Sequence, residues 1–493
     1  MPPVLLVFYL LRHLRWEQAI IWWLIASSLA FYAWWSPVHL ILLLLSVSVN
    51  FLIHKALLST KSRSLLATGI MGNLALLIYF KYADFMIGNI NSITGEEIPL
   101  LNIVLPLAIS FFTFQQISFL CDTYRGDITK CNFSKYCLFV VFFPQLIAGP
   151  IVLQKHTIPQ FSLNSFTNRT GLNFVIGSTL FVIGLFKKIV IADGIAPYSN
   201  AVFSLTEEGN ALPPEIAWMG IIAYTFQIYF DFSGYCDMAL GLARMFGIKL
   251  PINFNSPYKA VNIVDFWRRW HITLSIFLRD YLYIPLGGSR HGKFRRYLNL
   301  TLTMVLGGLW HGASWNFVFW GLLHGCYLSI NHAWSALGLS QQLEAIIPVP
   351  VVKFCSHILT IFAVMIAWVF FRAESFSGAE ILLLSMFGQA GYILPQATSS
   401  LTLDQELFWF LTILLSGIVF FCPNSIEITK KYQPAIDSIK VLGDTTKIKN
   451  FLSININWRP SSSWSLVMLF VGFISIIQIY RLDDLTEFIY FNF

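Results

Sequence analysis

Long apolar stretches, separated by short polar segments, recur along the whole chain. Most are close to the roughly 20 apolar residues that an α-helix needs to cross a lipid bilayer. They occupy residues 19–35, 39–53, 65–86, 99–120, 136–153, 173–191, 216–232, 298–330, 352–371, 407–421 and 463–480. This pattern predicts an all-α polytopic membrane protein with about eleven transmembrane helices.

Two of these stretches are irregular. The stretch 298–330 is longer than one span and contains several glycines, so it is either two segments or one span plus a re-entrant piece. The stretch 136–153 is interrupted by Pro144, Gly149 and Pro150, as a re-entrant loop lining a cavity would be.

Composition agrees with a membrane protein. Hydrophobic residues make up 56% of the 493 residues and charged residues 12%, about half the charge of a soluble domain. The net charge of +7 comes from cations in short loops between apolar stretches, so we expect the lipid bilayer as a partner and no nucleic acid. The seven cysteines are scattered and form no CxxC pair, which argues against a metal site or a disulfide framework.

The basic loops predict an orientation in the membrane. Cation-rich loops stay in the cytoplasm, and residues 259–296 form the most basic stretch of the chain. Counting the spans puts this stretch on the cytoplasmic side only if the chain over 216–250 returns to the side that it left. We therefore expect a second crossing or a re-entrant turn there.

His311 lies inside an apolar stretch, where a polar side chain must be hydrogen-bonded or used. If the stretch is one helix, Gly307, Gly308, His311 and Trp315 share a face. The glycines would leave room for a ligand chain, and the imidazole could act as a general base on a hydroxyl. The alternative is a buried, hydrogen-bonded histidine beside glycines that let helices pack closely. The pattern alone favours neither.

His271 follows two arginines that stand between two tryptophans, Trp267 and Trp270, and on a continuous helix it shares a face with Ser275. Adjacent arginines among aromatic rings suit a ligand with phosphate groups, because a guanidinium binds phosphate through two hydrogen bonds and stacks on rings. The alternative is an interfacial helix whose arginines reach lipid phosphates, with Arg279 and Asp280 as an ordinary polar pair.

Asp231 and Asp237 follow another apolar stretch. An acid at membrane depth is a functional or network residue, and we expect these two to pair with the Arg268 and Arg269 region or to cap helix ends. His324 lies off the helical face of His311, and we assign no chemistry to it.

Four segments carry a resemblance to a known family. They are FFPQLIAGPI, QIYFDFSGYCDMALGLARMFGIKLPINFNSPY, DFWRRWHITLSIFLRDYLYIPLGGSR and GLWHGASWNFVFWGLLHG. In this order they resemble the membrane-bound O-acyltransferase family, and within it the bacterial branch of alginate O-acetyltransferases. The resemblance implies helices and re-entrant segments around a central cavity. We expect N-terminal transmembrane helices over 1–98, a catalytic core over 99–335, and C-terminal transmembrane helices and interfacial loops over 336–493.

The family motifs also imply roles for residues of this chain. The histidine of the WHG motif corresponds to His311, as catalytic base, and that of the WRRWH motif to His271, as second catalytic residue. The residues expected to bind the acyl donor are Arg268, Arg269, Trp270, Ser275 and Arg279. Those expected to line the cavity are Asp231, Asp280, Gly307, Gly308, Trp310 and Trp315.

The resemblance implies an O-acyltransferase of the bacterial inner membrane, a multi-pass enzyme with no bound cofactor. Its expected donor substrate is acetyl-CoA or another acyl thioester, either free or on an acyl carrier protein. Its expected acceptor is a hydroxyl of an extracytoplasmic polysaccharide or of a periplasmic esterase-like partner. Two alternatives remain, D-alanyl transfer from a carrier protein to teichoic acid and, in another class, a polysaccharide transporter or flippase subunit. A flippase should show inverted repeats, and the sequence shows none.

Overall fold

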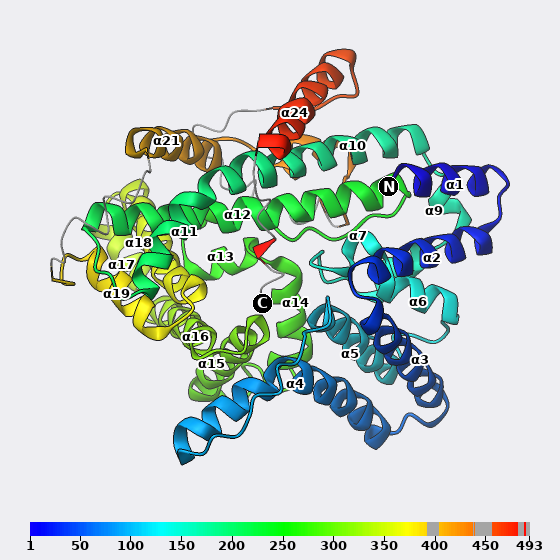
Figure 1. Ribbon diagram of the computed structural model, residues 1–493, viewed down its shortest axis with the longest axis horizontal. Helices are drawn as coiled ribbons and strands as arrows, with labels where there is room; N and C mark the ends of the chain where they lie inside the picture. The colour runs from blue at the N-terminus through cyan, green and yellow to red at the C-terminus, as the bar shows by residue number, and fades with distance from the viewer. Residues whose placement is uncertain (392–403, 437, 439–455, 482–487, 490–493) are drawn as a thin grey trace.

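The computed structural model describes residues 1–391, 404–436, 438, 456–481 and 488–489. Over these residues the regular elements are helices (Figure 1). The protein is therefore an all-α membrane protein, as its apolar pattern predicts. Five of the described helices are long and apolar enough to cross a membrane, or six if a bent pair near residue 423 forms one span. The count of about eleven spans and the division into three parts remain predictions.

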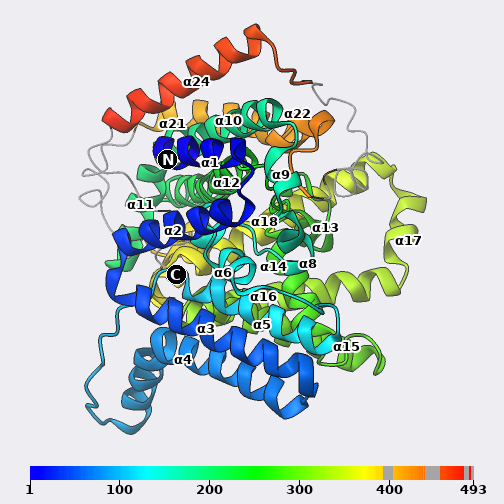
Figure 2. The ribbon, with the colours of Figure 1, turned by 90° about the vertical axis from the view of Figure 1, so that its right-hand side faces the viewer.

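The N-terminal helices lie along one side of the molecule. They are α1 (Pro2–His13), α2 (Glu17–Trp35), α3 (Pro37–Thr60) and α4 (Arg63–Thr94). The turn between α3 and α4 is sharp because Lys61 takes a left-handed conformation and the Ser62 side chain caps the next helix by accepting from Leu65 N. Figure 2 shows α3 and α4 side by side at the lower edge.

The centre of the fold is built on one long helix, α12 (Pro214–Met245), which is buried over most of its length. It packs against α10 (Thr170–Phe186) so closely that a Cβ on Gly184 would stand 2.4 Å from the carbonyl oxygen of Gly234. The π-helical turn η2 (Lys187–Ala192) and α11 (Asp193–Glu207) continue along it.

The second crossing that we considered within residues 216–250 does not form, because α12 is uninterrupted as far as Met245 and the chain turns only at Phe246 and Gly247. Instead the chain re-enters the core just after α12, in extended form. There Asn255 N donates to Arg269 O and Ile272 N donates to Asn253 O, both at 2.9 Å.

The elements that carry the candidate site follow one another along the chain. They are α13 (Ile263–Arg269), α14 (Ile272–Leu278), the π-helical turn η4 (Arg279–Tyr283), α15 (Gly292–His311) and α16 (Trp315–Ala336). The stretch 298–330 is thus two helices, one of the two alternatives that its length left open. The remaining elements surround this group (Figures 1 and 2). They are α5 (Ile109–Arg125), α6 (Phe133–Val141), α7 (Phe143–Leu146), α8 (Gln154–Thr157), η1 (Ile158–Gln160), α9 (Leu163–Thr167), η3 (Pro257–Lys259), α17 (Leu339–Ile346), α18 (Val349–Arg372), α19 (Phe376–Met386), α21 (Gln405–Phe421), α22 (Ser425–Thr429), η5 (Lys430–Tyr432) and α24 (Ser462–Arg481).

Candidate active site

Two buried histidines from different elements meet in the core. The ring centroids of His271 and His311 lie 6.3 Å apart, and the residues are 0% and 3% exposed. His311 is the last residue of α15, whereas His271 lies between α13 and α14. Forty residues of sequence separate them, and the fold brings them together.

The backbone at His271 forms a sharp bend. Its φ of 43° and ψ of 53° lie in the left-handed region, which non-glycine residues seldom adopt and which costs on the order of 1–3 kcal/mol. The helix that we expected to continue from Arg268 to Ser275 is therefore interrupted. The break turns the imidazole away from the preceding arginines and toward α15.

Asn253 fixes the tautomer of His271. Thr273 donates to Asn253 Oδ1 from its backbone N (3.2 Å) and from Oγ1 (2.9 Å), which identifies this atom as the amide oxygen. The same oxygen lies 3.1 Å from Nδ1 of His271. Because an amide oxygen only accepts, the proton of the neutral ring is on Nδ1, and Nε2 holds the lone pair.

Residues of α4 hold the end of α15. Lys81 Nζ donates to the carbonyl oxygens of Trp310 (2.5 Å) and His311 (3.0 Å), and the Tyr82 hydroxyl donates to that of Leu309. The last carbonyls of a helix have no partner within the helix and attract positive charge. These contacts fix the position of the residue that carries the second imidazole.

Aromatic rings enclose His311. The ring centroids of Trp310, Trp320 and Phe371 lie 4.9, 5.1 and 5.2 Å from that of the imidazole. Trp310 is 5% exposed and also stacks on Phe114. Such surroundings exclude water and strengthen every electrostatic interaction with a reacting group.

The glycines near His311 act mainly in helix packing. A Cβ on Gly308 would stand 2.1 Å from the carbonyl oxygen of Phe317 on α16, which is the packing alternative left open by the sequence. Gly307 instead faces Leu278 of α14. The chain is extended at Gly312 (φ −162°), so Trp315 starts a new helix rather than continuing the face of His311. The face that these residues would share on a single helix therefore ends at His311.

A cavity of about 450 Å³ lies between α14, η4, α15 and α16. We call it the basic cavity, because Arg279 and Arg296 line it together with polar side chains. The polar lining residues are Ser275, Tyr283, Ser289, Thr303 and His332. Arg296 Nη2 donates to Nδ1 of His332 at 2.8 Å, so this ring accepts at Nδ1. Leu278, which also faces Gly307, and Met304 line the same cavity.

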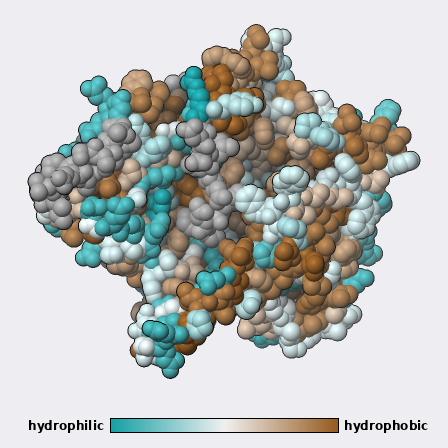
Figure 3. Space-filling view, viewed as in Figure 1, coloured by the Kyte–Doolittle hydropathy of each residue, from teal (hydrophilic) through white to brown (hydrophobic). Residues whose placement is uncertain are grey.

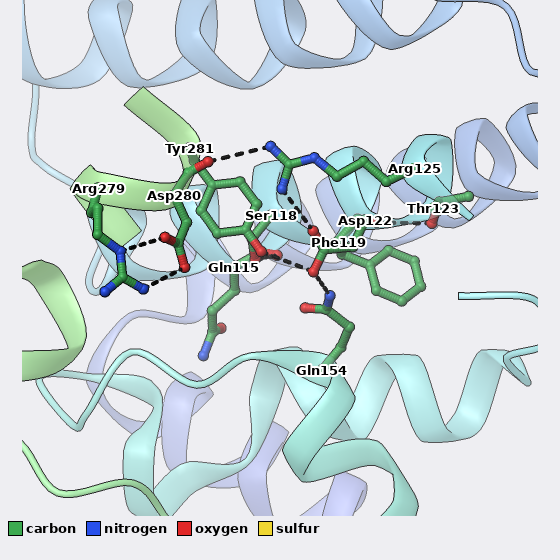
Figure 4. Close-up of polar contacts among 10 residues, drawn as sticks. All are labelled: Gln115, Ser118, Phe119, Asp122, Thr123, Arg125, Gln154, Arg279, Asp280 and Tyr281. Carbon is green, nitrogen blue, oxygen red and sulfur yellow. Dashed lines mark hydrogen bonds and ion pairs between the residues drawn. The ribbon is translucent and has the colours of Figure 1, made fainter. Parts of the chain in front are cut away.

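A polar cluster fastens η4, which carries Arg279, to α5 and α8 (Figure 4). Asp122 of α5 accepts from the Tyr281 hydroxyl (2.8 Å) and from the Gln154 side chain. Arg125 donates to the backbone oxygen of Asp280 at 3.3 Å, and the Asp280 carboxylate binds Arg279 at 2.6 and 3.1 Å. The pairing of Arg279 with Asp280, one of the alternatives from the sequence, is thus present.

A second cavity, of about 330 Å³, lies past the other end of α15. Its lining includes Lys81, Asp84, Gly312, Ser314 and Phe317. We call it the outer cavity. The basic cavity contacts α15 between Arg296 and Met304, and the outer cavity lies beyond its last residue.

The structure separates the residues that we expected to bind the donor. Ser275 and Arg279 line the basic cavity, and Arg268 is exposed, with its charge acting on His332. Arg269 is 7% exposed and forms an ion pair with Asp265 at 2.9 Å. Trp270 is buried among aromatic rings that include Phe254 and Trp368.

The residues that we expected to line a cavity are also spread out. Trp315 is 59% exposed and donates to Asn89 at 2.8 Å, next to the outer cavity. Asp231 lies elsewhere, on α12, and forms an ion pair with Lys188 at 2.7 Å. Its predicted pairing with the Arg268 and Arg269 region is therefore wrong.

Four further residues contact these elements without having been singled out in the sequence. Lys81 stands in an apolar stretch, so its charge at membrane depth was an available signal. No such signal marked the other three. The role of Asn253 depends on the bend of the chain after α12, and the contact between Arg296 and His332 depends on the packing of α15 against α16. Among the described residues, no group of three or more His, Cys, Asp and Glu side chains could hold a metal ion.

Comparison with known proteins shows which family the chain resembles. The sequence profile of the membrane-bound O-acyltransferase family matches residues 56–368. The chain is 39% identical to the peptidoglycan O-acetyltransferase of Helicobacter pylori, over 96% of this chain and 91% of that protein. It is 37% identical to the "Probable alginate O-acetylase AlgI" of Pseudomonas aeruginosa, over 90% and 84% of the two chains. A teichoic acid D-alanyltransferase of Streptococcus thermophilus is 30% identical over 46% of this chain and 57% of its own.

The family profile covers both histidines, the basic cavity and α4. The similarity to the two O-acetyl-transferring relatives extends well beyond it in each direction. The chain therefore belongs to the membrane-bound O-acyltransferase family and is an O-acyltransferase.

Proposed function

We propose that the chain moves an acetyl group from acetyl-CoA in the cytoplasm, through the membrane, to a hydroxyl of an extracytoplasmic polysaccharide or partner protein. The observation that carries this proposal is the position of His271 and His311, 6.3 Å apart and buried, between two cavities toward opposite ends of α15. A donor and an acceptor could approach one reacting centre from opposite faces.

The basic cavity supports a thioester donor of the coenzyme A type. The guanidiniums of Arg279 and Arg296 suit the phosphate groups of such a donor. The apolar side chains of Leu278 and Met304 lead from them toward the histidines. The acyl end of the donor would thus reach the centre while its phosphates stay at the polar end of the cavity.

In the proposed reaction, His311 takes the proton of the acceptor hydroxyl as the hydroxyl oxygen attacks the thioester carbonyl. The carbon–oxygen bond of the new ester forms, the carbon–sulfur bond breaks, and the leaving thiolate receives the proton from the His311 imidazolium. His271, with its proton held on Nδ1 by Asn253, keeps a lone pair on Nε2 beside this centre. Dry aromatic walls around His311 protect the thioester from hydrolysis.

The names of the relatives support a polysaccharide acceptor. Those with high coverage are named for peptidoglycan and alginate, and both names state O-acetyl transfer. On this basis we place the protein in the bacterial inner membrane, with a periplasmic esterase-like transferase as partner. D-alanyl transfer from a carrier-protein thioester is the second candidate, and the similarity that supports it covers 46% of the chain.

The test is acetyl turnover by the purified protein in liposomes. We expect radiolabelled acetyl-CoA to lose its label when cell-envelope extract is present, and His311→Ala to reduce this rate by at least about 100-fold, the usual size of a general-base effect. His39→Ala is the matched control, because His39 lies on α3 and bonds only to Ser36 among the described polar groups. Equal turnover in wild type and His311→Ala would contradict the proposed base.

A further inference from the structure

A buried arginine lies far from the two cavities, at the end of α12. Arg244 is 6% exposed, and its Nε forms no hydrogen bond. Within the described part of the chain, no carboxylate forms an ion pair with it. A buried cation without a partner is costly, and such groups are normally paired with an anion.

Two further cations lie in segments that pack together next to Arg244, since a Cβ on Gly247 would stand only 2.4 Å from Ser165 O. The charge of Arg169, an exposed residue at the start of α10, acts on Arg244. Lys249 lies in the segment after α12. Its pKa is lowered mainly by burial, and further by the positive charges of Arg244 and Arg169. We call these three residues the Arg244 cluster. Among the described residues, the charges that act on Arg244 and Lys249 are thus all positive.

The fold holds this cluster in place from several sides. Phe8 of α1 packs its ring against Phe166 of α9 (5.9 Å between centroids) and against Phe246 just after α12 (5.0 Å). Gln160 accepts from Lys249 N at 2.8 Å and donates to Lys249 O at 3.0 Å. Figures 1 and 2 both show α1, α9 and the end of α12 together. These contacts fix the backbone around Arg244 and Lys249.

The surface next to the cluster is apolar. On α1, Leu6 and Leu10 are 73% and 57% exposed, and Phe174 of α10 is 43% exposed. Tyr9 connects the two parts, because its ring packs against Phe174 and its hydroxyl donates to Met245 O at 2.9 Å. Hydrophobic side chains gather over α1 in the space-filling view (Figure 3). A further cation, Arg12, lies over the Tyr9 ring with a buried Nη1 that has no hydrogen-bond partner.

We propose that the Arg244 cluster binds a phosphate group, with the diacyl chains of a phospholipid lying on the exposed apolar side chains of α1 and α10. Guanidinium and ammonium groups match the charge and the oxygens of a phosphodiester. A free phosphate has the same chemistry without the chains. The apolar surface favours the lipid as the source.

The test uses the full-length protein, freed of lipid in detergent. Binding is measured by native mass spectrometry, and the melting temperature is followed with three probes: phosphatidylglycerol, diacylglycerol and inorganic phosphate. Phosphatidylglycerol should bind and raise the melting temperature, whereas diacylglycerol, which lacks the phosphate, should not. Arg244→Gln should weaken binding about tenfold, the cost of losing one charge-assisted contact.

Two more variants keep the test decisive. Arg169→Gln combined with Lys249→Gln alters the less buried members of the cluster and should also weaken binding, which covers the case in which Arg244→Gln fails to fold. Arg63→Gln, an exposed cation at the start of α4, should bind like the wild type.

A response to phosphatidylglycerol identifies a lipid as the source, and a response to inorganic phosphate alone identifies a free anion. In either case, loss of the response in the cluster variants supports the phosphate site. The proposal is overturned if neither probe binds, if diacylglycerol acts as strongly as phosphatidylglycerol, or if the cluster variants bind like the wild type.

Discussion

His271 and His311 were singled out by their chemistry in an apolar setting, and the fold brings them together. The sequence also pointed to Arg279 and Ser275, which line the basic cavity. It could not separate these from Arg269 and Trp270, because all four lie within one short motif. Their different surroundings depend on the left-handed backbone conformation at His271, which the residue pattern does not predict.

The contact of Asn253 with His271 can be tested by substitution. Its amide oxygen accepts from Nδ1 of His271, so Asn253→Ala removes the group that fixes the tautomer. We expect acetyl transfer to fall by about 10- to 100-fold, the range seen when a group that orients a histidine is removed. The KM for acetyl-CoA should change little. Steady-state kinetics of the purified variant measures both.

Thr273→Val is the control for this prediction. It removes the 2.9 Å hydrogen bond from Thr273 Oγ1 to Asn253, together with the acceptor of Ile151 N, but leaves the contact with His271. It should be affected less than Asn253→Ala. Full activity in Asn253→Ala would mean that the tautomer of His271 does not matter for transfer.

At the level of elements, α15 is positioned by its contacts with α4 and α16. The apolar stretches predicted these helices well, because long runs of apolar residues fix the existence and type of an element. The breaks at Gly312 and Trp270 were missed. Both lie inside motifs whose residues suit a continuous helix, and tertiary contacts decide the local conformation.

Lys81 connects α4 to the end of α15 that carries His311. Lys81→Met leaves two buried carbonyl oxygens without their donor, so the position of His311 should shift. A displacement of about 1 Å at a reacting group can cost roughly 100-fold in rate, and we expect a loss of this order in kcat.

Lys81→Arg should recover much of the lost rate, because it restores a cationic donor at the helix end. Lys55→Met, on the neighbouring α3, serves as the control. Equal losses in Lys81→Arg and Lys81→Met would argue against positioning by charge.

Gly308 sets the distance between α15 and α16. In Gly308→Ala the new Cβ would stand 2.1 Å from Phe317 O, so the helices must move apart at a cost of about 1–3 kcal/mol. We expect a lower melting temperature in detergent. Gly72→Ala on α4 should not lower it, since nothing lies within 4 Å of its added Cβ. An unchanged melting temperature in Gly308→Ala would show that the contact is not tight.

For the whole molecule, composition and apolar patterning were enough to predict an all-α membrane protein, and four motifs were enough to predict its family. The path of the chain was harder to predict. The second crossing expected within 216–250 came from counting spans against the basic loops, whereas α12 continues to Met245 and the chain turns at Phe246 and Gly247. Inside this helix Asp231 and Asp237 are paired with Lys188 and Lys187. Ion pairing between distant segments allowed α12 to remain continuous.

The central claim is that the acetyl group crosses the membrane between the two cavities. The most direct test uses sealed membrane vesicles of both orientations, given radiolabelled acetyl-CoA, which does not cross the bilayer. We expect base-labile label in the enclosed polysaccharide of inverted vesicles, where the cytoplasmic face is outside. We expect none in right-side-out vesicles or with His311→Ala. Equal labelling in both orientations, or in the His311→Ala vesicles, would contradict the account.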